Sequence, residues 1–321
     1  MDDREERAEN RTPPFFIAAS ASLPVRFFDR DQQTPIVAGR LFRRGGAARR
    51  LCGRADCVRA ASPEHRRPRP PFSSPFAGEP FIVHREHHRW FSPSLGRDME
   101  LLVFGHGGAR MLVFPTSMGR YYEWEDQRMM DALGEHIRNG WLQVFCVDSV
   151  DAESWYARGK HPHDRAVRQG QYEDYIVREV IPFTQSRNGN PFLIATGASF
   201  GAYHAVNIAL RHPWLFGRVI GLSGLYDIRE QTDGYYDDTV AAQNPSHYVS
   251  TIDDHGHLEA MRRMDIILAT GEGDSFVDNN RYLSGVLWGK GVGNALRLWD
   301  GWAHDWPWWR DMIRAYVGGS D

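Results

Sequence analysis

From residue 81 onward, the chain alternates between short apolar runs and stretches in which apolar residues recur with the period of a helix. The apolar runs predict strands over residues 87–91, 99–104, 110–114, 142–148, 191–196, 218–222, 265–269 and 295–299. The helical pattern predicts helices over residues 125–138, 172–185, 200–211, 279–290 and 306–317. Because strands joined by crossover helices run parallel, the prediction is an α/β fold: a mostly parallel, twisted sheet with helices on both faces.

Two segments interrupt this pattern. Residues 1–80 hold 15 Arg, no Lys and 10 acidic residues, with no lasting apolar period, and such a segment buries too little apolar surface to fold. We therefore expect a disordered Arg- and Pro-rich extension, followed by a folded domain over residues 81–321. Residues 225–264 are polar and predict a small cap-like insertion, whose Tyr235, Tyr236 and Tyr248 either line a substrate pocket or pack on the domain.

Composition excludes several classes of protein. A net charge of −3 gives no reason to expect nucleic-acid binding, and no run reaches the roughly 18 apolar residues of a membrane span. The acidic N-terminus is unlike a secretory signal, and Cys52, Cys57 and Cys146 form no disulfide framework or zinc motif. We expect a cytoplasmic protein in which Cys146 is a core residue; the composition leaves the oligomeric state undetermined.

The segment Gly197-Ala198-Ser199-Phe200-Gly201 carries the first chemical signal. It follows an apolar strand and opens a helix, which is the setting of a nucleophile on a sharp strand-to-helix turn. Small residues must flank such a serine because the backbone is strained and its neighbours are close. The helix N-terminus directs free N–H groups toward the place where an oxyanion forms. Ser199 is the predicted nucleophile of a serine hydrolase of the α/β-hydrolase type.

The partners of such a serine follow in the order acid, then histidine. His304 comes after the last predicted strand and suits the general base, which takes the serine proton. Asp274 lies in the turn after the strand over residues 265–269 and is the preferred acid. Glu272 and Asp278 compete with it, and Asp278 also suits a helix cap.

An oxyanion hole needs two N–H donors. One is the backbone N–H of Phe200, directly after the nucleophile. The other is expected in the loop over residues 115–119, where Pro115 has no N–H, so Ser117 or Met118 is favoured over the rest of the loop. Gly105-His106-Gly107-Gly108 resembles a lipase oxyanion motif but precedes its strand, so we interpret it as a hairpin turn.

Two clusters of ligand-type residues, 161–164 and 253–257, fall in predicted polar loops. We interpret them as solvated loops, because a bound metal needs three or four converging donors. The predicted chemistry requires no metal and no cofactor.

Residues from about 81 to 317 resemble the putative esterase family of α/β-hydrolases, which includes S-formylglutathione hydrolases (esterase D), feruloyl esterases and mycolyltransferases. The resemblance rests on the Ser199 motif, on Gly-x-x-Asp-x-Phe at residues 271–276 and on Gly-Trp-Ala-His-Asp-Trp at residues 301–306. It implies Ser199, Asp274 and His304 as the triad, with a backbone donor near Ser117. The Gly-Leu turn of those relatives is Thr116-Ser117 here.

The predicted function is hydrolysis of a small-molecule carboxylic ester through an acyl-enzyme on Ser199. The same triad also serves an acyltransferase or a thioesterase. A catalytically silent binding protein on the hydrolase fold is the interpretation of a different class.

Overall fold

The structure, a computed structural model, describes residues 84–318, and the predicted extension over residues 1–80, with Cys52 and Cys57, lies outside them. Eight strands form one sheet in the order β1-β2-β4-β3-β5-β6-β7-β8. The pairs β1–β2 and β2–β4 are antiparallel and the other five pairs are parallel, so the predicted sheet is confirmed. The strands are β1 (Arg85–Ser92), β2 (Arg97–Phe104), β3 (Ala109–Phe114), β4 (Leu142–Val147), β5 (Leu193–Ala198), β6 (Arg218–Leu222), β7 (Asp265–Gly271) and β8 (Ala295–Trp299).

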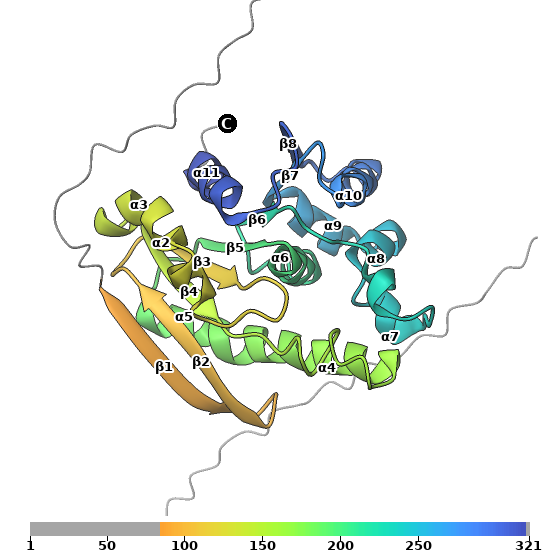
Figure 1. The fold of residues 1–321 in the computed structure, drawn as a ribbon, viewed down its shortest axis with the longest axis horizontal. Helices are drawn as coiled ribbons and strands as arrows, with labels where there is room; N and C mark the ends of the chain where they lie inside the picture. Colours follow the sequence, from red (N-terminus) through yellow and green to blue (C-terminus); the bar gives the residue numbers. More distant parts are fainter. Residues whose placement is uncertain (1–83, 319–321) are drawn as a thin grey trace, which may run out of the picture. The chain divides into compact units, whose positions relative to one another are not determined.

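Helices cover both faces of the sheet (Figure 1). One face is covered by α1 (Glu123–Asp126), α2 (Met129–Ala132), α3 (Gly134–Arg138) and α11 (Trp306–Val317). The other is covered by α4 (Pro162–Tyr175), the π-helix η1 (Ile176–Val180), α5 (Ile181–Arg187), α6 (Phe200–Arg211), α8 (Pro245–Thr251), α9 (His255–Arg262) and α10 (Val277–Gly289). The 3₁₀ helix η2 (Ile228–Gln231) and α7 (Asp238–Ala241) complete the segment between β6 and β7. No helix within residues 84–318 combines the length and apolar character needed to cross a bilayer.

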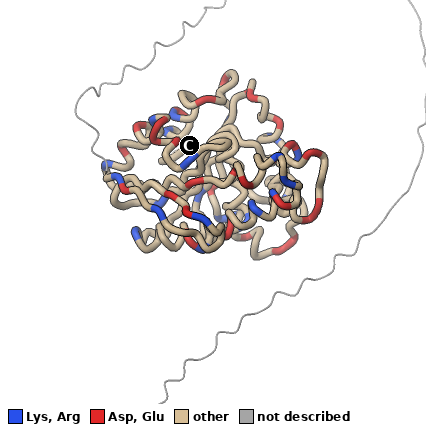
Figure 2. Tube along the Cα trace, turned by 60° about the horizontal axis from the view of Figure 1, so that its bottom comes forward, with Lys and Arg blue, Asp and Glu red and all other residues tan. Residues whose placement is uncertain are grey.

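Each central strand supplies both layers of the core, because successive side chains of a strand point to opposite faces. On β3, Leu112 and Phe114 join the cluster under α4 and α6, whereas Met111 and Val113 join the cluster under α2 and α11. Cys146 is buried in the second cluster, which confirms its prediction as a core residue. Figure 2 shows basic and acidic residues interspersed along this domain.

Two predicted helices are wrong in extent. The helix expected over residues 125–138 is three short helices, and the left-handed backbone of Arg128, with φ 60°, interrupts it after α1. The helix expected over residues 172–185 begins ten residues earlier at Pro162. Proline suits the first position of a helix, and the His161 side chain caps that end by accepting the N–H of His163. The cluster over residues 161–164 is therefore a helix start and not a polar loop.

The interpretation of Gly105-His106-Gly107-Gly108 as a hairpin turn is also wrong. The segment does join β2 to β3, but β4 lies between those two strands in the sheet. A glycine is needed at Gly108, where φ is +88° and an added Cβ would lie 2.0 Å from the carbonyl carbon of Trp141. The turn lies at the N-terminal end of β3, the edge opposite to the end of β5 that carries Ser199.

A buried carboxylate joins α4 to the end of α6. Glu173 accepts hydrogen bonds from Arg211 at 2.8 Å, His212 at 2.6 Å and Gln243 at 3.0 Å. Burial alone would raise the pKa of Glu173, but the hydrogen bond from His212 and the charge of Arg211 outweigh burial and lower the pKa to about 2.

We expect this shift to make the free energy of unfolding depend on pH. The pKa of Glu173 is lower in the folded state than in the unfolded state, so its contribution is complete above about pH 5 and is lost as the pH falls toward 2. The full contribution is about 3 kcal/mol, of which roughly half is lost by pH 3. Urea unfolding at pH 6 and pH 3 should show a smaller decrease for Glu173→Gln than for the wild type, and equal decreases would contradict the prediction.

Candidate active site

Ser199 lies on a sharp turn between β5 and α6. Its backbone has φ 54° and ψ −120°, a left-handed conformation that costs a non-glycine residue energy. Its N–H donates to the carbonyl of Leu222 on β6 at 2.8 Å. The flanking glycines are needed for space: a Cβ on Gly197 would lie 2.2 Å from the carbonyl oxygen of Gly201, and a Cβ on Gly201 would lie 2.4 Å from the carbonyl oxygen of Phe114.

The structure brings Ser199, His304 and Asp274 into one hydrogen-bonded chain. The His304 Nε2 lies 3.1 Å from the Ser199 Oγ, and the His304 Nδ1 lies 2.9 Å from the Asp274 Oδ2. Because β5, β7 and β8 are parallel, the loops that follow them reach the same edge of the sheet. Three residues from distant parts of the sequence therefore meet at one place.

The Asp274 carboxylate is fully buried and each of its oxygens is hydrogen-bonded. Its Oδ1 accepts the backbone N–H of Phe276 at 2.9 Å, and its Oδ2 accepts the Thr270 hydroxyl at 2.9 Å as well as His304. Burial alone would raise the pKa of Asp274, but the hydrogen bonds from His304 and Phe276 outweigh burial and lower it. Asp274 is therefore a fixed anion beside the imidazole at neutral pH.

Neither of the two other candidate acids is hydrogen-bonded to His304. Glu272 is exposed, and Asp278 is largely exposed and pairs with Arg281 on α10 at 3.0 Å. Asp278 lies in the first turn of α10, while Phe276 is the residue at its N-cap.

Ser223, which no sequence pattern indicated, holds the loop that carries His304. Its hydroxyl donates to the carbonyl of Ala303 at 3.0 Å and accepts the indole N–H of Trp309 at 3.1 Å. Ser223 and Ala303 both have left-handed backbones, with φ 51° and 43°. The only sequence signal was a serine directly after the predicted strand at residues 218–222. Two strained residues thus fix the approach of His304 to Ser199.

Aromatic rings surround the imidazole of His304. The ring centroids of Trp302, Phe276 and Trp309 lie 5.6, 5.4 and 5.3 Å from it. Trp302 is 56% exposed, so it presents an aromatic surface to solvent beside the imidazole. Trp124 and Trp155, by contrast, are buried in the core.

Some backbone N–H groups near the nucleophile are already hydrogen-bonded within the protein, and others are free to bind an oxyanion. In the loop after β3, the N–H of Thr116 donates to Glu123 at 2.7 Å and that of Met118 donates to Asp151 at 2.9 Å. Burial raises the pKa of Glu123. The N–H groups of Ser117 and Phe200 have no acceptor among the residues that the structure describes. Phe200 opens α6, where the first N–H groups have no partner within the helix.

Tyr156 holds the Ser117 side chain in place. The Tyr156 hydroxyl donates to the Ser117 Oγ at 2.7 Å, and the Tyr156 ring contacts the Phe200 ring edge-on at 5.1 Å. Tyr156 thus contacts both residues whose N–H groups are unengaged.

The remaining His- and Asp-rich segments have structural partners. The His163 Nδ1 lies 2.6 Å from Asp237, the cap of α7. Asp254 caps α9 by accepting the N–H of His257, so the segment over residues 253–257 is a helix start and not a solvated loop. Within residues 84–318, no three His, Cys, Asp or Glu side chains converge in a geometry suited to a metal ion.

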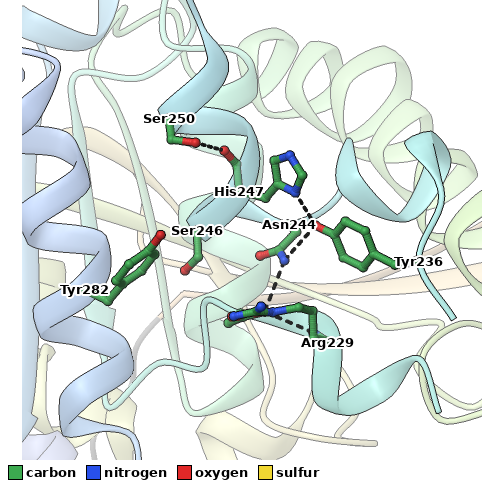
Figure 3. A pocket seen from close by; sticks show the side chains of 8 residues that line it. Arg229, Tyr236, Asn244, Ser246, His247, Ser250 and Tyr282 are labelled. Carbon is green, nitrogen blue, oxygen red and sulfur yellow. Dashed lines mark hydrogen bonds and ion pairs between the residues drawn. The ribbon is translucent and has the colours of Figure 1, made fainter. Parts of the chain in front are cut away.

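A pocket of about 530 Å³ lies between η2, α8 and α10, apart from the triad (Figure 3). None of Ser199, Asp274 and His304 lines it. Tyr236 contributes to this pocket, whereas Tyr248 packs against the core. The lining residues are Asp227, Arg229, Tyr236, Asn244, Ser246, His247, Ser250 and Tyr282.

The sheet order and the strand–serine–helix turn define the class: this is an α/β-hydrolase fold. Similar solved structures include a ferulic acid esterase, with a TM-score of 0.61, 17% identity, and coverage of 73% of this chain and 96% of that chain. An S-formylglutathione hydrolase from Staphylococcus aureus has a TM-score of 0.56 and 15% identity, with coverage of 74% of this chain and 96% of that chain. MPT51 from Mycobacterium tuberculosis has a TM-score of 0.55 and 18% identity, with coverage of 73% of this chain and 97% of that chain.

The family model described as "Putative esterase" matches residues 122–317, which is more than half of the chain. The chain therefore belongs to this esterase family, as the resemblance in the sequence implied. A comparison with curated proteins found no match.

Proposed function

We propose that the chain hydrolyses carboxylic esters in two steps through an acyl-enzyme on Ser199. The observation that carries this proposal is the chain of hydrogen bonds from Ser199 through His304 to Asp274. His304 takes the hydroxyl proton as the Ser199 Oγ attacks the ester carbonyl, and Asp274 stabilises the imidazolium that forms. The imidazolium then protonates the departing alcohol.

The second step reverses these roles. His304 removes a proton from water, the resulting hydroxide attacks the acyl carbonyl, and the proton passes to the Ser199 Oγ as the acid leaves. In both steps a tetrahedral oxyanion forms, and its donors are the N–H groups of Phe200 and Ser117. The N–H of Met118 is excluded as a donor because Asp151 already accepts it. Loss of one donor typically lowers turnover by about 10²–10³.

A fluorophosphonate probe tests the nucleophile directly. We expect one covalent adduct, which peptide mass spectrometry should assign to Ser199, together with hydrolysis of short p-nitrophenyl esters. Ser199→Ala should lose both the adduct and the hydrolysis. Ser186→Ala, which removes an exposed serine on α5, should keep both. Labelling or hydrolysis that persists in Ser199→Ala would refute the assignment.

A further inference from the structure

An aspartate and a histidine are buried together beneath the proposed oxyanion hole, and the proposed mechanism uses neither. Asp151 follows β4 and its side chain is fully buried; His204 lies on α6 and is 1% exposed. The His204 Nε2–H donates to the Asp151 Oδ1 at 2.8 Å. A buried carboxylate is costly unless both of its oxygens are satisfied, so the partner of its second oxygen is informative.

That second oxygen reaches the loop after β3. The Asp151 Oδ2 accepts the N–H of Met118 at 2.9 Å. Met118 has a left-handed backbone, with φ 59°, although its side chain is exposed and packs into no core cluster. The hydrogen bond to Asp151 therefore restrains a strained residue directly after Ser117.

His204 extends this connection to the other donor. It lies one turn beyond Phe200 on α6, and its ring contacts the Phe200 ring edge-on at 5.0 Å. The Gln169 amide N–H donates to its Nδ1 at 3.3 Å, which leaves Nε2 as the protonated nitrogen that faces Asp151. One buried carboxylate thus links the helix that carries the Phe200 N–H to the loop that carries the Ser117 N–H.

We propose that Asp151 and His204 are positioning residues that set the distance between the two oxyanion donors, an inference that rests on the proposed function of Ser199. Oxyanion donors act at 2.7–3.1 Å from the developing charge, and a misplacement of about 1 Å costs on the order of 10²-fold in rate. Without the Asp151 carboxylate, Met118 relaxes its strained backbone and the Ser117 N–H moves with it. Substrate binding in the ground state depends little on this distance, whereas the tetrahedral state depends on it strongly.

Asp151→Ala tests the proposal through kcat, KM and the Ki of a trifluoromethyl ketone, which forms a tetrahedral oxyanion on Ser199. We expect kcat to fall by about 10²-fold, Ki to rise by a similar factor and KM to change by less than about threefold. Asp151→Asn should restore most of the activity, because its amide oxygen still accepts the Met118 N–H. Its NH₂ group then faces the Nε2 of His204, so the imidazole proton moves to Nδ1, where the Gln169 amide can turn its unpartnered oxygen to accept it. Circular dichroism and thermal unfolding establish that each variant is folded.

Glu173→Ala is the matched control. It also removes a buried carboxylate that is hydrogen-bonded to a histidine at α6, but that histidine, His212, lies at the opposite end of the helix from Phe200. Glu173→Ala should lower the melting temperature and leave kcat and Ki within about threefold of the wild type.

The double variant Asp151→Leu/His204→Phe separates positioning from stability. Replacing both partners of a buried hydrogen bond with apolar side chains of similar volume is often nearly neutral for stability, yet it leaves Met118 without its acceptor. If Asp151→Ala does not fold, this variant decides the question: it should be folded, with the same losses in kcat and ketone affinity. A folded Asp151→Ala or double variant with kcat and Ki near wild type overturns the proposal, as does an equal loss in Glu173→Ala. An unreactive wild type, or an active Ser199→Ala, refutes the proposed nucleophile instead.

Discussion

Replacing His304 with alanine should lower kcat on a p-nitrophenyl ester by about six orders of magnitude, because the serine hydroxyl then has no base within reach. The His304 Nε2 is 3.1 Å from the Ser199 Oγ, and no other imidazole in the described part of the chain is hydrogen-bonded to that oxygen. Residual turnover about 10³–10⁴-fold above the reaction in water should remain, because the oxyanion donors and substrate binding survive. Stopped assays at high enzyme concentration measure this remainder.

A double variant tests whether Ser199 and His304 act as one unit. When a nucleophile and its base act as one unit, removing both costs no more than removing either. The variant Ser199→Ala/His304→Ala should therefore be as slow as each single variant. Losses that multiply would mean that the two residues act independently, which contradicts the proposed mechanism.

Many of the strands and helices that carry this site can be predicted from the sequence, because the patterns that indicate them are local. The helix over Phe200–Arg211 and the strands β6 and β8 have the predicted bounds, since each is a short apolar or amphipathic run between clear breaks. The chain order Ser199, Asp274, His304 could also be predicted, because each residue follows a predicted strand of one parallel sheet. Local signals also misled: the residues around Pro162 appeared to be a polar loop, although proline with a capping histidine starts a helix.

The contacts that no sequence pattern indicated are those that depend on strand order. Asp151 and His204 are 53 positions apart, and Ser223 and Ala303 are 80 apart. They meet only because β3 lies between β4 and β5, and because β6, β7 and β8 are neighbours. The choice of Asp274 over Glu272 also depended on which side chain turns inward after β7. Periodicity reports which face of an element is buried, but it does not report which loops meet.

Asp274→Asn should lower kcat by about 10⁴-fold while leaving KM and the melting temperature close to wild type. The backbone N–H of Phe276 donates to the Oδ1 of Asp274, so the amide oxygen of the asparagine must occupy that position. Its NH₂ group then faces the Nδ1 of His304, where the carboxylate oxygen was. Because two donors cannot bond to each other, His304 is forced to keep its proton on Nε2, the nitrogen that must accept the serine proton.

Two conservative variants provide the control for this change of tautomer. Glu272→Gln and Asp278→Asn also remove a carboxylate near β7, yet both side chains are exposed and neither is hydrogen-bonded to His304. Both should keep kcat within about threefold of the wild type, since surface substitutions of this kind have small effects. An NMR measurement of the imidazole nitrogens should find the proton on Nδ1 in the wild type and on Nε2 in Asp274→Asn. A large loss of kcat in either control, with Asp274→Asn still active, would transfer the role of the acid to that residue.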